Sequence, residues 1–185
     1  MFISSVIPYK DATMKELFQL LAKYNTQTNA EMMEILEKLT PEQVTKDVGS
    51  FYGSILGLVN HILVTDCAWL KRFCNQFPEL DQINAKLPEF TMKGWKDIIW
   101  PSLTAWKPIR ITVDQALEQA CDLLLEKQYA SVMEYKGWDG KDMKKIVWLV
   151  FAHLFNHQTH NRGQIAVLLD QMGIENDYSG ILNKF

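Results

Sequence analysis

Three of the four histidines of this 185-residue chain, His153, His157 and His160, lie within eight residues of one another. The fourth, His61, stands alone in an apolar segment, LGLVNHILVTDCAWL. Two imidazoles from one helix and one from another can form a three-nitrogen metal site, which leaves coordination positions open for water or substrate. The alternative is that each histidine is a hydrogen-bonded core residue, because buried polar groups normally find partners.

The segment 147–172, which carries the three clustered histidines, follows a helical period better than a strand alternation. One stripe at steps of three and four residues contains Val147, Val150, Leu154, His157, Asn161, Gln164 and Leu168. This stripe predicts the core-facing side, with His157 and Asn161 one turn apart. His153 and His160 fall on an adjacent stripe, although a His157–His160 pair is also geometrically possible.

Three stretches of the chain resemble one known family. NHQTHNRGQ, followed by an apolar helix end and Met-Gly, is similar to the signature helix of the DinB/YfiT-like superfamily of metalloenzymes. VNHILVTDCAWLKRF resembles the second helix of that family, where a histidine begins an H-x-x-x-D pattern; here His61 and Asp66 have one extra residue between them. AKYNTQTNAEMMEIL resembles the first helix. The resemblance implies an all-α fold, a four-helix bundle forming a single domain over residues 1–185, often dimeric.

The resemblance also implies one metal ion bound by three histidines, one from the second helix and two from an H-x-x-x-H pattern just before Arg-Gly-Gln. The corresponding positions are His61, His157 and Asn161, so an asparagine stands where the family has its third histidine. An amide oxygen is a weaker and harder ligand than imidazole. We therefore expect a divalent metal, zinc- or nickel-like, at His61, His157 and Asn161, with His160 as the alternative third ligand.

Two reaction types follow from the resemblance: transfer of a thiol sulfur (S-transferase) and metal-assisted hydrolysis. In both, a metal-bound thiol or water is the nucleophile, so the expected partner is a small-molecule substrate such as a low-molecular-weight thiol. Arg162 can orient an anionic substrate or brace a carboxylate, and we favour the brace. The alternative function is a non-catalytic dimeric bundle that has lost the third histidine at Asn161.

Composition argues against several classes of protein. The net charge of −3 gives no phosphate-binding basic surface, so no nucleic-acid partner is expected. The start of the chain shows no signal peptide, and the apolar run 146–152 is too short to span a membrane. The three cysteines, Cys67, Cys74 and Cys121, form no C-x-x-C pair, which indicates packing thiols in a reducing cytoplasm. The same run, IVWLVFA, is apolar around most of a helix and favours a homodimer.

The apolar periodicity predicts four long helices, over residues 14–39, 50–75, 112–135 and 147–172. Asp11 is the expected cap of the first helix. Thr40 and Gln43 form a capping box for a short helix, and Thr112 and Gln115 form another for the third long helix.

The remaining segments are predicted to be connections. Residues 76–111, rich in proline and tryptophan, are interpreted either as an aromatic-rich cover over one end of the bundle or as a packed structural excursion, with WKDIIW as a short helix. GWDG at 137–140 predicts a turn, from which Asp139 caps the signature helix. Gly53 and Gly57 at the start of the second long helix permit the close approach of a neighbouring segment.

Overall fold

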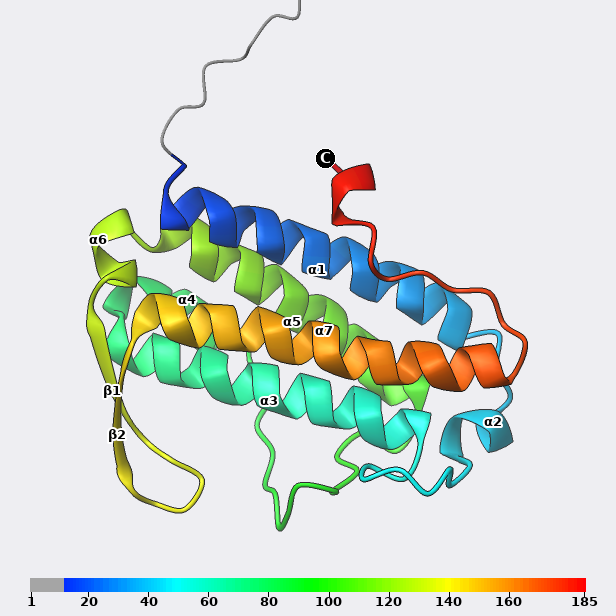
Figure 1. The fold of residues 1–185 in the computed structure, drawn as a ribbon. Helices are drawn as coiled ribbons and strands as arrows, with labels where there is room; N and C mark the ends of the chain where they lie inside the picture. Colours follow the sequence, from blue (N-terminus) through cyan, green and yellow to red (C-terminus); the bar gives the residue numbers. More distant parts are fainter. Residues whose placement is uncertain (1–11) are drawn as a thin grey trace, which may run out of the picture.

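The computed structural model describes residues 12–185. Its longest helices lie side by side, as Figure 1 shows. They are α1 (Met14–Leu36), α3 (Ile55–Gln76), α5 (Leu103–Leu123) and α7 (Val147–Gln171). α1 and α3 each pack against both α5 and α7, so every long helix has two neighbours. The protein is mostly helical, as the sequence predicted, with one β-hairpin that the sequence analysis missed.

The core lies between these helices because each presents an apolar stripe at helical spacing. Leu58 and Ile62 of α3, Val113 of α5 and Leu154 of α7 are all almost completely buried. Full burial of one such side chain contributes about 1.5–3 kcal/mol. Among the described residues no helix combines the length and hydropathy needed to cross a bilayer.

α3 is covered on its outer side by the connection that leads to α5, so most of its residues are buried. Asn60 fixes this connection: its Oδ1 accepts hydrogen bonds from the backbone N–H groups of Ile99 and Trp100, and its Nδ2 donates to the carbonyl of Trp100. The indole N–H of Trp106 donates to the carbonyl of Val59. The segment is therefore a packed cover on α3. It contains η1 (Pro78–Leu80) and α4 (Asp81–Asn84), whereas the helix predicted at WKDIIW is wrong, since residues 95–100 form turns and bends.

Side-chain caps set the helix starts. Thr13 and Glu16 form the capping box of α1, while the predicted cap Asp11 lies outside the described residues. The capping box of Thr40 and Gln43 is confirmed, at the start of α2 (Pro41–Thr45).

α7 begins at Val147 as predicted, whereas α3 and α5 begin away from their predicted starts. α3 begins at Ile55, later than predicted, because residues 50–53 form a turn and Ser54 is the cap. α5 begins at Leu103, well before the predicted start, because Ser102 caps it and Pro108 is accommodated inside the helix. The hydroxyl of Thr112 donates to the carbonyl of Pro108 instead of capping a helix.

The predicted continuation of the third helix to residue 135 is wrong. After α5 come α6 (Glu126–Tyr129) and an antiparallel hairpin of β1 (Val132–Lys136) and β2 (Asp142–Ile146). The predicted turn at 137–140 is its tip. Asp139 accepts a hydrogen bond from the N–H of Lys141 within that tip, so it does not cap α7, which receives no side-chain cap from the described residues. The chain closes with η2 (Ile181–Asn183).

Candidate metal centre

His61 of α3 and His157 of α7 meet where the two helices pack together. Their Nε2 atoms are 2.8 Å apart, and the ring planes cross at 62°. His61 is buried and His157 is half-buried. The helical phase deduced for residues 147–172 brings these two imidazoles to the same place from segments 96 residues apart.

Both imidazoles are neutral at pH 7. Burial lowers the pKa of His61 to about 4. Burial also lowers the pKa of His157 to about 4, and the nearby His61, His153 and His160 add to that effect. A neutral imidazole keeps a nitrogen lone pair, which is the form that binds a metal ion.

Asn161 lies one turn beyond His157 and is 1% exposed. Its Nδ2 donates to the backbone carbonyl of His157 at 2.8 Å and lies 3.2 Å from His157 Nε2. Its Oδ1 has no hydrogen-bond partner within residues 12–185, and neither has His157 Nδ1. The three positions expected from the sequence therefore come together, but Asn161 turns its nitrogen, not its oxygen, towards the imidazole.

Tyr52 completes the cluster and was not found from the sequence. Its Oη lies 2.8 Å from His61 Nε2, and its ring stacks on the imidazole with centroids 4.0 Å apart. Gly57 makes this approach possible, because a Cβ there would lie 1.9 Å from the carbonyl oxygen of Tyr52. The two glycines at the start of the helix were the available signal: they predicted a close neighbour but not which side chain it brings.

The other two histidines lie on the outer stripe of α7. His153 and His160 are exposed, as are Leu149 and Val167 on the same stripe. His160 Nε2 bonds to the Gln164 side chain at 2.8 Å, so its nitrogen is directed to its own helix surface. Within residues 12–185 no three His, Cys, Asp or Glu side chains gather as metal ligands.

Aromatic side chains from two connections surround the cluster. Trp95, from the loop before α5, has its ring centroid 6.3 Å from that of His61, and Trp138 at the hairpin tip lies 4.5 Å from Trp95. Figure 1 shows the loop and the hairpin projecting on the same side of the helices. Trp95 and Trp138 are 43% and 50% exposed, so both are partly open to solvent, and the guanidinium of Arg72 lies over the Trp138 ring.

A network of buried charged and amide side chains lies close to the histidines. Arg110 of α5 places Nη1 2.5 Å from Asp66 Oδ2 and Nη2 2.8 Å from Asp114 Oδ1. Burial raises the pKa of Asp114 to about 6 and also raises the pKa of Asp66, while Arg110 opposes both shifts. Two carboxylates in the core are thus held by one guanidinium.

Arg162 of α7 extends this network to α1. Its Nη1 donates to the amide oxygens of Asn25, Asn29 and Gln158. The Gln158 amide in turn donates to Asp66 at 2.7 Å, and the Asn29 amide donates to Asp114 at 2.9 Å. Arg162 is buried and acts as a brace, as we favoured, but through amides that relay to the carboxylates. It is not free to orient a substrate.

The cysteines take no part in this chemistry. Cys67, Cys74 and Cys121 are all buried and unbridged. Burial raises the pKa of Cys67 to about 12 and that of Cys74 to about 11, so both remain thiols at pH 7. They pack in the core as expected.

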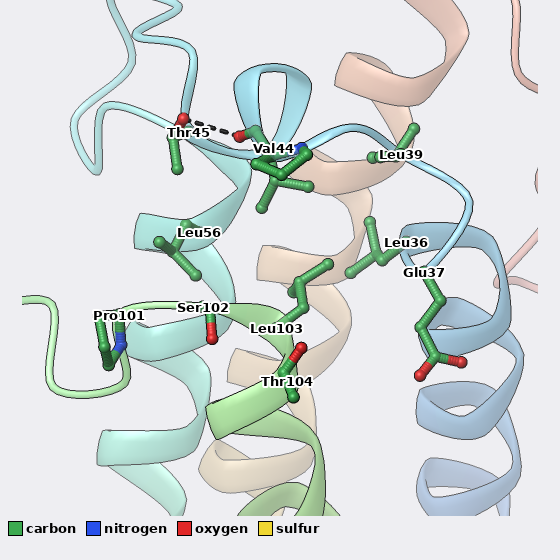
Figure 2. Close-up of a pocket in the computed structure, with 11 residues that line it drawn as sticks. Leu36, Glu37, Leu39, Val44, Thr45, Leu56, Pro101, Ser102, Leu103 and Thr104 are labelled. Atoms are coloured by element: carbon green, nitrogen blue, oxygen red, sulfur yellow. Dashed lines mark hydrogen bonds between the residues drawn. The ribbon is translucent and has the colours of Figure 1, made fainter.

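A separate cavity of about 340 Å³ lies at the end of the helices near α2 (Figure 2). Leu36, Val44, Leu56 and Leu103 give it apolar walls, and Glu37 and Ser102 contribute polar atoms. The histidines are not among its lining residues. This hollow is therefore distinct from the histidine cluster.

Comparison with known proteins agrees with the geometry. The model of a family described as "DinB family" matches residues 12–178, a span that contains all four long helices, the histidine cluster and the buried network. The protein named "Protein DinB" from Bacillus subtilis (strain 168) is 21% identical to the chain over 158 residues, which cover 83% of this chain and 84% of that protein. With its sequence matched across nearly all of its length, the chain belongs to the DinB family.

Proposed function

We propose that the protein binds a divalent metal ion, zinc- or nickel-like, through Nε2 of His61 and His157. The supporting observation is the 2.8 Å separation of these two nitrogens. An imidazole nitrogen carries either one proton or one lone pair. His157 Nε2 and Tyr52 Oη both lie 2.8 Å from His61 Nε2, so His61 Nε2 cannot make a full hydrogen bond to each of them at once. A cation held by both imidazoles would remove this competition for His61 Nε2, because His61 and His157 would each direct a lone pair to the ion.

The donor set fits such an ion. Imidazole nitrogen is a common ligand of zinc, and His61 and His157 are the two residues that would hold the ion. Both imidazoles are already neutral and need not lose a proton. Asn161 is the third position expected from the sequence. Its unpartnered Oδ1 becomes a donor if the amide turns over, at the cost of the hydrogen bond to the carbonyl of His157.

The proposed activity is that of a metal-dependent S-transferase or hydrolase acting on a small molecule. When bound, the metal lowers the pKa of a coordinated thiol or water and so supplies the nucleophile. Trp95 and Trp138 shelter the site and offer apolar faces to a substrate. Arg162 and its partners fix α1, α3, α5 and α7 relative to one another, so that His61 and His157 remain opposed.

Metal titration of the purified protein tests this proposal. We expect one ion per chain, and His157→Ala should abolish binding because it removes one of the two imidazoles. His153→Ala is the matched control: it removes an exposed histidine of the same helix and should leave affinity unchanged. Loss of binding in His153→Ala with retention in His157→Ala would show that the site uses the outer stripe of α7. A screen for thiol transfer and hydrolysis with the metal-loaded protein then distinguishes the two reactions.

The second candidate function is a non-catalytic bundle, and the orientation of the Asn161 amide favours it. Its nitrogen faces His157 Nε2, so the third ligand of the family is replaced by a group that cannot bind a cation in this orientation. Purified protein without stoichiometric metal, and unable to take up zinc or nickel, would support this candidate over the enzyme.

We also propose that the four long helices form the family's four-helix bundle as one cytoplasmic domain, and that two copies form a homodimer. The unbridged cysteines suit a reducing compartment. Leu17 of α1 lines an apolar hollow with Trp148 of α7, and Leu17 is largely exposed, so a second copy can cover this face. Light scattering at micromolar concentration should give twice the chain mass; a monomer alone would contradict the dimer.

A further inference from the structure

We propose that Tyr52 supplies the third donor of the metal centre, as a phenolate oxygen in place of the histidine that the family has at position 161. This inference rests on the proposed function, because it assumes an ion at His61 and His157. It differs from the expectation drawn from the sequence, in which Asn161 or His160 fills the third position.

The donor atoms already form a chain. Tyr52 Oη lies 2.8 Å from His61 Nε2, which lies 2.8 Å from His157 Nε2. Asn161 offers an amide N–H at the corresponding place, and His160 bonds to Gln164 on the exposed side of the helix. Of these candidates, Tyr52 is the one whose oxygen already lies within hydrogen-bond distance of a histidine nitrogen, His61 Nε2.

The backbone holds Tyr52 in this position. It lies in the turn before α3, where Gly53 has a φ of +76° and donates its N–H to the carbonyl of Ser50 at 3.0 Å. Gly57 leaves room for the carbonyl of Tyr52, which would overlap any Cβ at that residue. The ring is fixed in turn by stacking on His61. The hydroxyl therefore reaches the cluster through a turn and a glycine contact that admit little movement.

Charge favours the same assignment. His61, His157 and Asn161 are neutral donors, so they leave a divalent ion without a compensating negative charge. Asp66, a carboxylate on the same helix as His61, is occupied by Arg110 and Gln158. Tyr52 would hold the ion through Oη once its hydroxyl proton had passed to solvent, a loss that the bound cation would have to drive because burial raises the pKa of Tyr52.

The test compares wild type with Tyr52→Phe, which removes Oη but keeps the stacked ring. In zinc titrations we expect Tyr52→Phe to bind about tenfold or more weakly. The copper(II)-loaded wild type should show a visible phenolate-to-metal charge-transfer band that Tyr52→Phe lacks. Tyr135→Phe is the matched control: Tyr135 is half-buried in the hairpin, its ring packs on Trp69, and the change should alter neither measurement.

The outcomes separate the two proposals. If Tyr52→Phe binds zinc as tightly as wild type or more tightly, and no charge-transfer band exists, the hydroxyl is only a hydrogen-bond partner that the ion displaces. The inference is then overturned, while the loss of binding in His157→Ala still supports the proposed function. If zinc binding is insensitive to both His61→Ala and His157→Ala, the proposed function fails, and the role of Tyr52 fails with it.

Discussion

Replacing Arg110→Met tests the buried network, because it removes the guanidinium between Asp66 and Asp114 but keeps a long apolar side chain. Arg110 is completely buried, and both carboxylates lie within 2.8 Å of it. Removing one partner of a buried ion pair costs roughly 3–5 kcal/mol. Proteins of this kind have a free energy of unfolding of only about 5–15 kcal/mol. With about 2–4 °C lost per kcal/mol for a chain of this length, we expect the Tm to fall by roughly 6–20 °C.

The measurements are urea unfolding, which gives the free energy of unfolding, and thermal unfolding, which gives the Tm, both followed by circular dichroism at pH 7. Lys107→Met is the matched control. Lys107 lies on α5, like Arg110, and forms an ion pair at 2.6 Å with Glu37 at the end of α1, but the two side chains are 40% and 46% exposed. An exposed pair of this kind contributes about 0–1 kcal/mol. The contrast between the two variants therefore isolates the effect of burial.

The pH dependence gives the refuting result. Burial raises the pKa of Asp114 to about 6 even with Arg110 beside it, and loss of the guanidinium raises that pKa further. A carboxyl whose pKa is raised in the folded state stabilises most at low pH and loses that contribution as pH rises. The penalty of Arg110→Met should thus be small in acid and grow as pH rises above about 6. A penalty below about 1 kcal/mol, or one independent of pH, would show that the network is not held by charge.

Three further predictions concern the histidine cluster. Burial lowers the pKa of His61 and His157 to about 4, from an ordinary 6.5, so the protein should lose stability as pH falls from 6.5 towards 4. Replacing both histidines by Gln should make the urea midpoint depend less on pH between pH 7 and 4.5. Asn161→His should tighten zinc binding about tenfold or more, read by competition with a chelating dye, because it restores the family's imidazole; unchanged affinity would count against this position as part of the site. Gly57→Ala should weaken zinc binding as Tyr52→Phe does, because its Cβ displaces the carbonyl of Tyr52; wild-type affinity in a folded variant would show that the turn adjusts freely.

The helices and the opposed histidines could be predicted because their signals are local and repeated. Val150, Leu154 and His157 share one stripe over several turns, and this periodicity fixed the phase of α7. The capping box at Thr40 was equally local, since both of its partners lie within four residues. The family likeness then paired His61 with His157, which no periodicity within one segment could do.

The connections could not be predicted because their structure depends on distant contacts. In residues 132–136 only Met133 and Tyr135 point inward, and an alternation of two side chains is too short to distinguish a strand from the end of a helix. The start of α5 was predicted too late because Thr112 and Gln115 match a capping box, whereas the helix begins at Leu103 and already contains Pro108. The contact that defines this connection, between Asn60 and Trp100, spans 40 residues.

The sequence also contains a pattern that indicates the buried network. Asp66 interrupts the apolar run of α3, Arg110 lies one turn before Val113, and Arg162 lies one turn before Ile165. Each of these charged residues thus lies in line with core residues of its helix, where burying a charge costs free energy unless it is paired. Opposite charges at such positions on different helices predict contact, although not which charges meet: Arg162 reaches the carboxylates only through amides.

The network joins side chains that are far apart along the chain: 44 residues separate Asp66 from Arg110, and 137 separate Asn25 from Arg162. Contacts of this range form only after the intervening chain has closed, so we expect them to be completed late in folding. Interactions that are missing from the folding transition state act mainly on the unfolding rate. The lifetime of the folded protein, more than the speed at which it forms, therefore depends on these buried charges. Once the four helices have assembled around them, they should separate slowly.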